Sequence, residues 1–197
     1  MARPSISART ERPTVTDGLM AVRGRRLRVQ VRRPQAPSGP PLLLLNGIGA
    51  PLDLLDPFVD ALPADREIIR LDPPGIGGSP DVLLPYHLTT FAPVVGDLVA
   101  QLGHDRVDVL GYSWDGDLAQ QLAATVGWTS LPVLRLIRAR TLVIAGTDDP
   151  IIPTANATIL GRGLPDARVH HHPGGHLAIV TEARELAGVA AEFLGAS

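Results

Sequence analysis

Residues 106–122 read RVDVLGYSWDGDLAQQL, and their hydrophobic period changes abruptly at a serine. Val107, Val109 and Leu110 form a short apolar run with β-branched members, which is typical of a strand. Leu118 and Leu122 instead recur at helical spacing. The pattern predicts a strand, a sharp turn and a helix, with Ser113 at the turn. A hydroxyl group in that place projects toward the space that the first N–H groups of the helix face, so Ser113 is a candidate acyl-transfer nucleophile.

A serine nucleophile needs a base to take its proton, an acid to orient the base, and donors for the oxyanion. Asp149 lies in a loop that follows an apolar run at residues 141–145. His176 follows a Pro-Gly-Gly turn after the last predicted strand, residues 164–172. A lone histidine after such a turn is usually no more than exposed, but the place of His176 after that strand favours the role of general base.

Further motifs flank these residues in a fixed order. They are NGIGA at 46–50, DPPGIGGS at 72–79, the serine turn at 111–116, GWTS at 127–130, the loop that carries Asp149, and GHL at 175–177. In this order they resemble the α/β-hydrolase family and, more narrowly, the intracellular medium-chain poly(3-hydroxyalkanoate) depolymerases. The resemblance covers residues 42–194. A serine turn alone is weak evidence, whereas several motifs in family order are specific.

The resemblance implies a role for each candidate residue. Ser113 is the expected nucleophile, His176 the expected base, and Asp149 the acid that orients the base. In this family the acid is the third residue after the glycine that closes its strand, which selects Asp149 over Asp148. The resemblance implies neither a metal nor an organic cofactor.

The turn at residues 46–49 follows an aliphatic run, and its glycines let the backbone approach a substrate closely. Taken alone, this motif would more often be a strand-to-helix turn without a ligand. By the pattern of the family, the backbone N–H groups of Ile48 and Trp114 form the oxyanion hole.

Two other motifs suggest cofactor sites, and neither site is favoured. The loop at residues 72–79 lacks the third glycine of a dinucleotide fingerprint, and Pro80 interrupts the helix that should follow. The resemblance assigns this loop to the floor of the active site. The histidines at 170–172 would alternate faces on a strand, and without cysteine or a nearby acidic cluster we expect no zinc site.

Length and composition favour one soluble domain. With 197 residues, 45% of them hydrophobic, the chain can bury one sizeable core, and its net charge of −2 and 4% aromatic content give no nucleic-acid or membrane-surface signal. We expect residues 1–16 to be a disordered lead-in and residues 17–197 a single α/β-hydrolase domain. The lead-in lacks the apolar core of a secretory signal, and a transit peptide is the less favoured alternative. The absence of cysteine fits a reducing compartment, so a cytoplasmic location is expected.

The predicted fold is an α/β-hydrolase-like three-layer sandwich with a mostly parallel sheet of about seven strands and no cap domain. Residues 19–22 and 27–31 alternate apolar and polar residues around Arg23-Gly24-Arg25, which predicts an antiparallel hairpin. Residues 42–45 are continuously aliphatic, as in a strand buried on both faces near the centre of the sheet. Apolar spacing predicts amphipathic helices near 54–62, 91–102 and 182–194.

The segment between residues 125 and 141 departs from the family. In relatives, another strand and a helical cap follow the serine helix, and this sequence has room for neither. We expect the strand at 141–145 to pair directly beside the strand at 107–110, because the interval still allows a right-handed crossover. A site without a cap would be open, shallow and poorly selective. Its apolar floor would favour dimerisation or adsorption to a hydrophobic surface such as a polyester granule.

Asp115 replaces the second glycine of the family's Gly-x-Ser-x-Gly motif, at a position that is normally small because helix and strand pack closely there. A carboxylate in the first helical turn is favourable by about 0.3 to 1 kcal/mol. Beside a developing oxyanion it would cost on the order of 3 kcal/mol, or about a hundredfold in rate. We therefore predict that Asp115→Gly raises the activity measured in an ester hydrolysis assay, and an unchanged or lower activity would contradict this.

The sequence thus predicts a serine hydrolase that cleaves carboxylic esters through an acyl-Ser113 intermediate, and the resemblance points to medium-chain 3-hydroxyacyl esters. One alternative is a broad short-chain carboxylesterase that uses the same residues. Another is a catalytically silent, hydrolase-like scaffold, which Asp115 and the missing strand favour. The expected partners are an ester or polyester substrate, with a homodimer or hydrophobic polymer granules as further associations, and we expect neither nucleic acid nor a membrane span.

Overall fold

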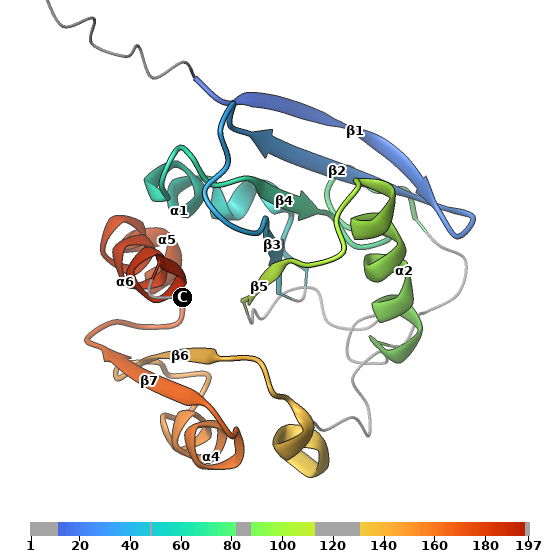
Figure 1. Cartoon of the computed structure of the whole chain (residues 1–197). Coiled ribbons are helices and arrows are strands. Elements are labelled where there is room, and N and C mark those ends of the chain that lie inside the picture. The colour runs from blue at the N-terminus through green and yellow to red at the C-terminus, as the bar shows by residue number, and fades with distance from the viewer. Residues whose placement is uncertain (1–11, 48, 82–87, 113–130, 196–197) are drawn as a thin grey trace, which may run out of the picture.

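The computed structural model describes residues 12–47, 49–81, 88–112 and 131–195 (Figure 1). The strands are β1 Thr14–Val22, β2 Arg25–Arg33, β3 Leu42–Leu45, β4 Ile68–Leu71, β5 Asp108–Gly111, β6 Thr141–Gly146 and β7 Ala167–His172. The helices are η1 Leu52–Leu55, α1 Asp56–Ala61, α2 Leu88–Gln101, η2 Leu131–Leu136, α4 Ala155–Gly163, α5 Ala178–Thr181 and α6 Ala183–Gly195, of which η1 and η2 are 3₁₀ helices. Within these described ranges, none of the helices combines the length and the apolar character needed to cross a bilayer.

The N-terminal hairpin is confirmed. β1 and β2 pair antiparallel from Thr14↔Arg33 to Val22↔Arg25. Arg23 and Gly24 connect them with φ angles of 47° and 74°, the positive values that suit a tight hairpin with twisted strands. β1 begins at Thr14 and therefore takes in the last three residues of the expected lead-in, while residues 1–11 lie outside the described part.

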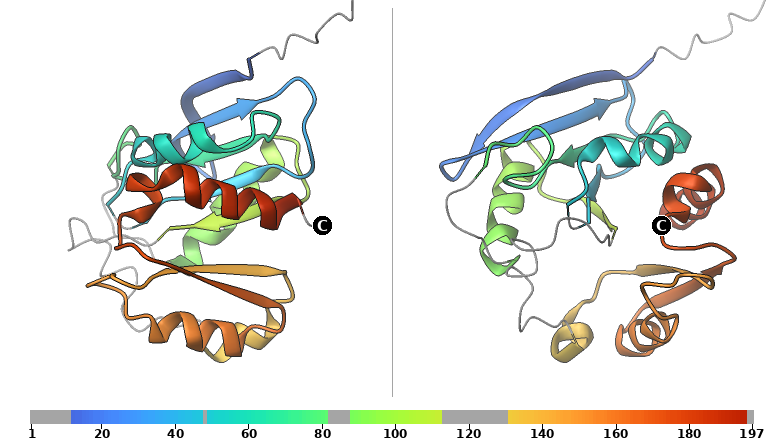
Figure 2. Two further views of the ribbon diagram at one scale, coloured as in Figure 1. Left: turned by 90° about the vertical axis from the view of Figure 1, so that its left-hand side faces the viewer. Right: turned by 180° about the vertical axis from the view of Figure 1, so that it is seen from behind.

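A three-layer arrangement is confirmed by the packing of β3. This strand lies between β4 and β5 and runs parallel to both. Leu43 packs into a core with α2, whereas Leu42 and Leu44 pack into a core with α1, α5 and α6. Figure 2 shows α2 on one side of the five-stranded sheet and α1 with α6 on the other. A continuous aliphatic run is therefore buried on both faces, as the sequence predicted.

The expected pairing of the strand at 141–145 with the strand at 107–110 is wrong. Among the described strands, β5 pairs with β3 alone and β6 with β7 alone, so the seven strands form a five-stranded sheet, β1-β2-β4-β3-β5, and a separate parallel pair. The pair is fastened to α6 instead of β5: at its start, the Arg140 guanidinium bonds to the Phe193 carbonyl and lies 4.2 Å from the centre of that ring.

The loop at residues 72–79 joins three elements. The fully buried Asp72 carboxylate accepts hydrogen bonds from the backbone N–H groups of Leu52 at 2.6 Å and Gly78 at 2.8 Å. Ser79 Oγ donates to the Asp72 carbonyl at 2.7 Å and accepts from the Arg28 N–H at 2.8 Å. These contacts tie β2, the end of β4 and the start of η1 together, so the loop has a structural role.

Candidate active site

The structure brings Asp149 and His176 together from two loops. His176 Nδ1 lies 2.8 Å from Asp149 Oδ2, and the two side chains expose 7% and 9% of their surface. A carboxylate can only accept a hydrogen bond, so Nδ1 carries the proton that it donates to Asp149. This leaves Nε2 of the neutral ring as the basic atom. Asp148, the neighbour that was the rejected candidate, is exposed.

Close packing of backbone brings these two loops into contact. β6 ends at Gly146, where an added Cβ atom would lie 2.3 Å from the Gly174 carbonyl oxygen. The next residues bond across the same gap, with Thr147 N–H to the His172 carbonyl at 2.8 Å and Asp148 N–H to the Gly174 carbonyl at 3.2 Å. A glycine at 146 is therefore required for the carboxylate and the imidazole to meet.

Hydrogen bonds stabilise the ionised form of the Asp149 carboxylate. Burial alone would raise its pKa, but hydrogen bonds from the backbone N–H of Ile152, the ring of His176 and the backbone N–H of Ile151 outweigh burial and hold the pKa below its ordinary value of 3.8. The two backbone bonds, 2.8 Å from Ile151 and 2.9 Å from Ile152, both end on Oδ1. One oxygen therefore anchors the carboxylate to its own loop and the other orients His176.

Tyr112 connects this pair to the end of β5. Its hydroxyl donates a hydrogen bond of 2.9 Å to the His176 carbonyl, and the two ring centres lie 5.8 Å apart. Its backbone N–H bonds to the Leu45 carbonyl at 3.0 Å, which extends the pairing of β5 with β3. Tyr112 was missed in the sequence, where no spacing pattern marks a contact between residues 64 positions apart.

The other candidates lie outside the described residues. These are Ser113, Ile48, Trp114 and the neighbouring Asp115. Tyr112 is the residue before Ser113 in the chain, so the described part of β5 leads to the serine turn from a point beside His176. Asp149, His176 and Tyr112 also line one end of a cavity of about 740 Å³ that extends between β5 and β6.

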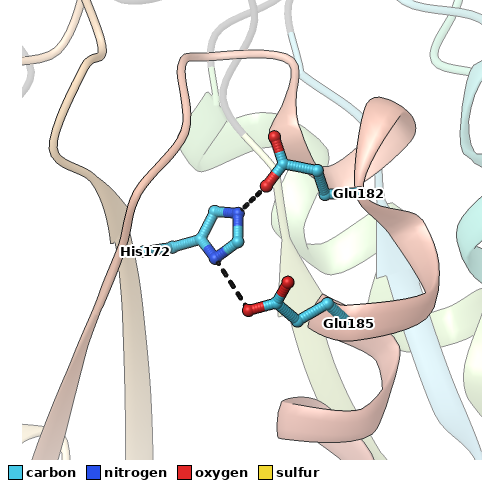
Figure 3. A group of neighbouring side chains, drawn as sticks. All are labelled: His172, Glu182 and Glu185. Atoms are coloured by element: carbon cyan, nitrogen blue, oxygen red, sulfur yellow. Dashed lines mark hydrogen bonds and ion pairs between the residues drawn. The ribbon is translucent and has the colours of Figure 1, made fainter.

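A second polar cluster surrounds His172, the last residue of β7 (Figure 3). The ring is almost fully buried, its Nε2 is hydrogen-bonded to Glu182, and its Nδ1 faces Glu185 Oε1 at 3.5 Å. One ligand atom from each of the three side chains lies within 4.8 Å of the others, so the group could hold a metal ion. Both ring nitrogens already face carboxylates, and we interpret the cluster as a clamp between β7 and α6. Sequence spacing gave no hint of it, because a turn and α5 separate the histidine from the glutamates.

Comparison with known proteins agrees with the α/β-hydrolase resemblance of the sequence motifs. A family model described as the alpha/beta hydrolase fold matches residues 40–127. A poly(3-hydroxyalkanoate) depolymerase from Ectopseudomonas oleovorans is 30% identical to this chain over 245 aligned positions, which cover 82% of this chain and 87% of that protein. Since 245 positions exceed the 197 residues of this chain, the relative contains segments that have no counterpart here.

Solved structures resemble this fold over most of its length. A hydrolase from Pseudomonas aeruginosa PA01 has a TM-score of 0.82 at 20% identity and is matched over 91% of this chain and 98% of that chain. The enol-lactonase from Burkholderia xenovorans LB400 has a TM-score of 0.72 at 17% identity, over 90% and 100% of the two chains. At these identities the likeness establishes the fold and leaves the reaction to be argued from the site.

Proposed function

Because this chain belongs to the α/β-hydrolase family, we propose that it hydrolyses carboxylic esters through an acyl-Ser113 intermediate. The single observation that carries the proposal is the buried hydrogen bond of 2.8 Å between Asp149 and His176, beside the end of the strand that leads to Ser113. Such a pair supplies the base and the orienting acid that a serine nucleophile requires.

In the proposed reaction, His176 Nε2 takes the proton of the Ser113 hydroxyl as its oxygen attacks the ester carbonyl carbon. The N–H groups of Ile48 and Trp114 stabilise the oxyanion of the tetrahedral intermediate. This intermediate collapses to the acyl-enzyme, and the leaving alcohol takes the proton from His176. Water then attacks the acyl group with the same base, which releases the acid and restores the serine.

We propose medium-chain 3-hydroxyacyl esters as the substrate class, since the relative at 30% identity is named a poly(3-hydroxyalkanoate) depolymerase. Exposed apolar side chains on and beside η2 support contact with a hydrophobic polymer. They are Leu131, Val133, Leu136 and Ile137, which we call the η2 patch. The proposal includes a cytoplasmic location, which fits a chain without cysteine.

A fluorophosphonate probe tests the proposal, because it reacts only with an activated serine. We expect one adduct per chain, which peptide mass spectrometry maps to Ser113 and which is lost in Ser113→Ala and His176→Ala. Asp149→Asn should label at least a hundredfold more slowly, while the exposed neighbour variant Asp148→Asn labels like the wild type. A folded wild-type protein that takes no label would instead support the silent scaffold.

The substrate class needs a second measurement. Hydrolysis of soluble p-nitrophenyl esters should be compared with acid release from a suspension of poly(3-hydroxyalkanoate) granules. Release of 3-hydroxy acids from the granules supports the depolymerase, whereas activity on soluble short esters alone supports a broad carboxylesterase.

A further inference from the structure

The cavity between β5 and β6 has the dimensions of a ligand site. Its volume of about 740 Å³ lies within the range of roughly 300 to 1,000 Å³ that is usual for small-molecule pockets. It follows both strands from their first residues to their last, and six residues of β6 extend over about 20 Å. The space is therefore long and narrow, as an extended chain requires.

The walls of the cavity differ in polarity. The helices that line it are apolar: Leu186 and Leu194 on α6 and Phe58 on α1 form one part, and Leu134 on η2 and Leu160 on α4 form another. β5 and β6 line the cavity as well, and among the described strands neither has a partner on the side that the other strand faces. Their backbone N–H and C=O groups favour water or polar ligand groups. An alkyl chain would thus lie against the apolar side chains of these helices.

The two ends of the cavity also differ. At the ends of the strands lie Tyr112, Asp149 and His176, where an ester carbonyl would react. At the starts of the strands the cavity reaches Arg140, which is held against Phe193 of α6. A ligand with a reactive polar end and an apolar chain matches the His176 end and the apolar helices that follow it, whereas Arg140 makes the far end polar as well.

We propose that this cavity, inside the sheet layer, binds the alkyl chain of the acyl group, with the ester at His176. The identity of the reacting end rests on the function proposed above. Each methylene group that leaves water for the apolar wall strengthens binding by about fourfold. A chain of medium length should therefore be favoured over acetate, in contrast to the poor selectivity expected of an uncapped site.

Polar substitutions at Val109 and Ile137, two residues that line the cavity, test whether it binds an alkyl chain. Val109 lies on β5 and is 60% exposed, and Ile137 follows η2 and is 38% exposed, so both positions should accept a polar residue without unfolding. Matched controls are Val15 on β1, 54% exposed, and Ile159 on α4, 47% exposed, which do not line the cavity.

The measurement is kcat/KM for p-nitrophenyl octanoate relative to p-nitrophenyl acetate. We expect a wild-type ratio of at least tenfold, a ratio about tenfold lower in Val109→Asp and Ile137→Asp, and the wild-type ratio in Val15→Asp and Ile159→Asp. Circular dichroism establishes folding, and if Val109→Asp does not fold, Ile137→Asp decides. A wild-type ratio near one, or folded cavity variants with the wild-type ratio, would overturn the inference while leaving ester hydrolysis in place.

Binding of decanoate, measured by calorimetry, separates this inference from the proposed function because it needs no turnover. If the wild type cleaves no ester but binds decanoate, and Val109→Asp or Ile137→Asp weakens that binding about tenfold, the cavity is a chain site and the proposed function fails. If the wild type neither cleaves esters nor binds decanoate, both proposals fail.

Discussion

Tyr112 joins the strand that precedes Ser113 to the loop that carries His176. Burial raises the pKa of its phenol to about 12, and the negative charge of Asp149 adds to the effect. The hydroxyl therefore stays protonated through the working pH range and remains a donor to the His176 carbonyl, 2.9 Å away. We assign Tyr112 as a positioning residue, which acts on the proposed reaction through His176.

Tyr112→Phe removes this bond and leaves the ring in place. A single hydrogen bond contributes about 0.5 to 1.5 kcal/mol, so the melting temperature should fall by about 1 to 6 °C for a chain of this size. We expect kcat for ester hydrolysis to fall about tenfold with little change in KM, because the imidazole loses its alignment. Thr181→Val, which removes an exposed hydroxyl-to-carbonyl bond to Leu177, serves as the control and should leave kcat unchanged. Equal kcat values for both variants would refute a positioning role.

Asp149 should give a pH signature in stability. Its pKa is held below 3.8 in the folded state, so folding favours the ionised form. The stabilisation is fully present above the unfolded carboxyl pKa of about 3.9 and is lost as the pH falls through the lower folded value. Asp149→Asn should therefore lower the free energy of unfolding at pH 7, with a difference from wild type that shrinks below about pH 4. Urea unfolding of both proteins from pH 3 to pH 7 measures this difference in the free energy of unfolding.

The control for this experiment is Asp148→Asn, at an exposed position next to Asp149. Its difference from wild type should stay small across the same range. A difference between Asp149→Asn and wild type that is constant with pH would show that the carboxylate contributes nothing through its charge.

At the scale of residues, the sequence predicted one contact of the site and could not predict two others. Asp149 and His176 were paired by motif order, and the structure brings them together, while their catalytic roles stay predictions. Tyr112 with His176 and His172 with Glu182 arise only from tertiary packing. No period along the chain encodes such contacts, so sequence patterns do not reveal them.

At the scale of elements, the loop at 72–79 depends on Gly77. Its φ angle is 52°, and an added Cβ atom would lie 2.3 Å from Oδ2 of the buried Asp72 carboxylate. Gly77→Ala combines backbone strain of about 1 kcal/mol or more with displacement of a carboxylate that holds Leu52 and Gly78. We expect a loss of about 2 to 4 kcal/mol in the free energy of unfolding, measured by urea denaturation.

Gly188→Ala on α6 is the matched control, because an added Cβ atom there meets nothing within 4 Å. This variant should be more stable than wild type by about 0.5 to 1 kcal/mol, as expected for alanine in place of glycine inside a helix. Equal effects of the two variants would show that the contacts of Asp72 do not matter for the loop.

The sequence predicted the strands that have a clear hydrophobic pattern, but it did not predict which strand each of them pairs with. The hairpin of β1 and β2 and the buried β3 follow from alternation and from a continuous apolar run. The predicted position of β6 was wrong, because the residues of a strand do not by themselves specify the strand beside which it pairs. Arg140 bonds to Phe193 and His172 faces Glu185, so the β6 and β7 pair is held to α6 by contacts that only the three-dimensional structure reveals.

The helix α6 holds the five-stranded sheet and the pair of β6 and β7 together. Leu186, Ala187 and Ala190 of α6 pack into the core that contains α1 and β3. Phe193 of the same helix contacts Arg140 at the start of β6, and Glu185 of the helix faces the His172 ring at the end of β7. The α/β-hydrolase fold is therefore kept although β5 and β6 are not paired with each other, which leaves the cavity as the opening between the two parts.

The η2 patch gives the molecule a face on which apolar side chains gather. Leu136 is 75% exposed, and Leu131, Val133 and Ile137 are exposed beside it. Burial of one leucine side chain contributes about 1.5 to 3 kcal/mol, so the patch should favour adsorption to a hydrophobic polymer. Leu136→Asp should therefore lower the fraction of protein that sediments with poly(3-hydroxyalkanoate) granules by about tenfold or more at equal protein concentration.

Leu19→Asp is the control for this adsorption, because Leu19 is an exposed leucine on β1, outside the η2 patch. It adds the same charge and removes the same side chain, so both variants carry the same net charge and any general electrostatic effect is matched. The two variants should differ in sedimentation with granules, with Leu19→Asp close to wild type. Equal sedimentation of both would mean that adsorption does not depend on this face, and granule association would then need another surface of the molecule.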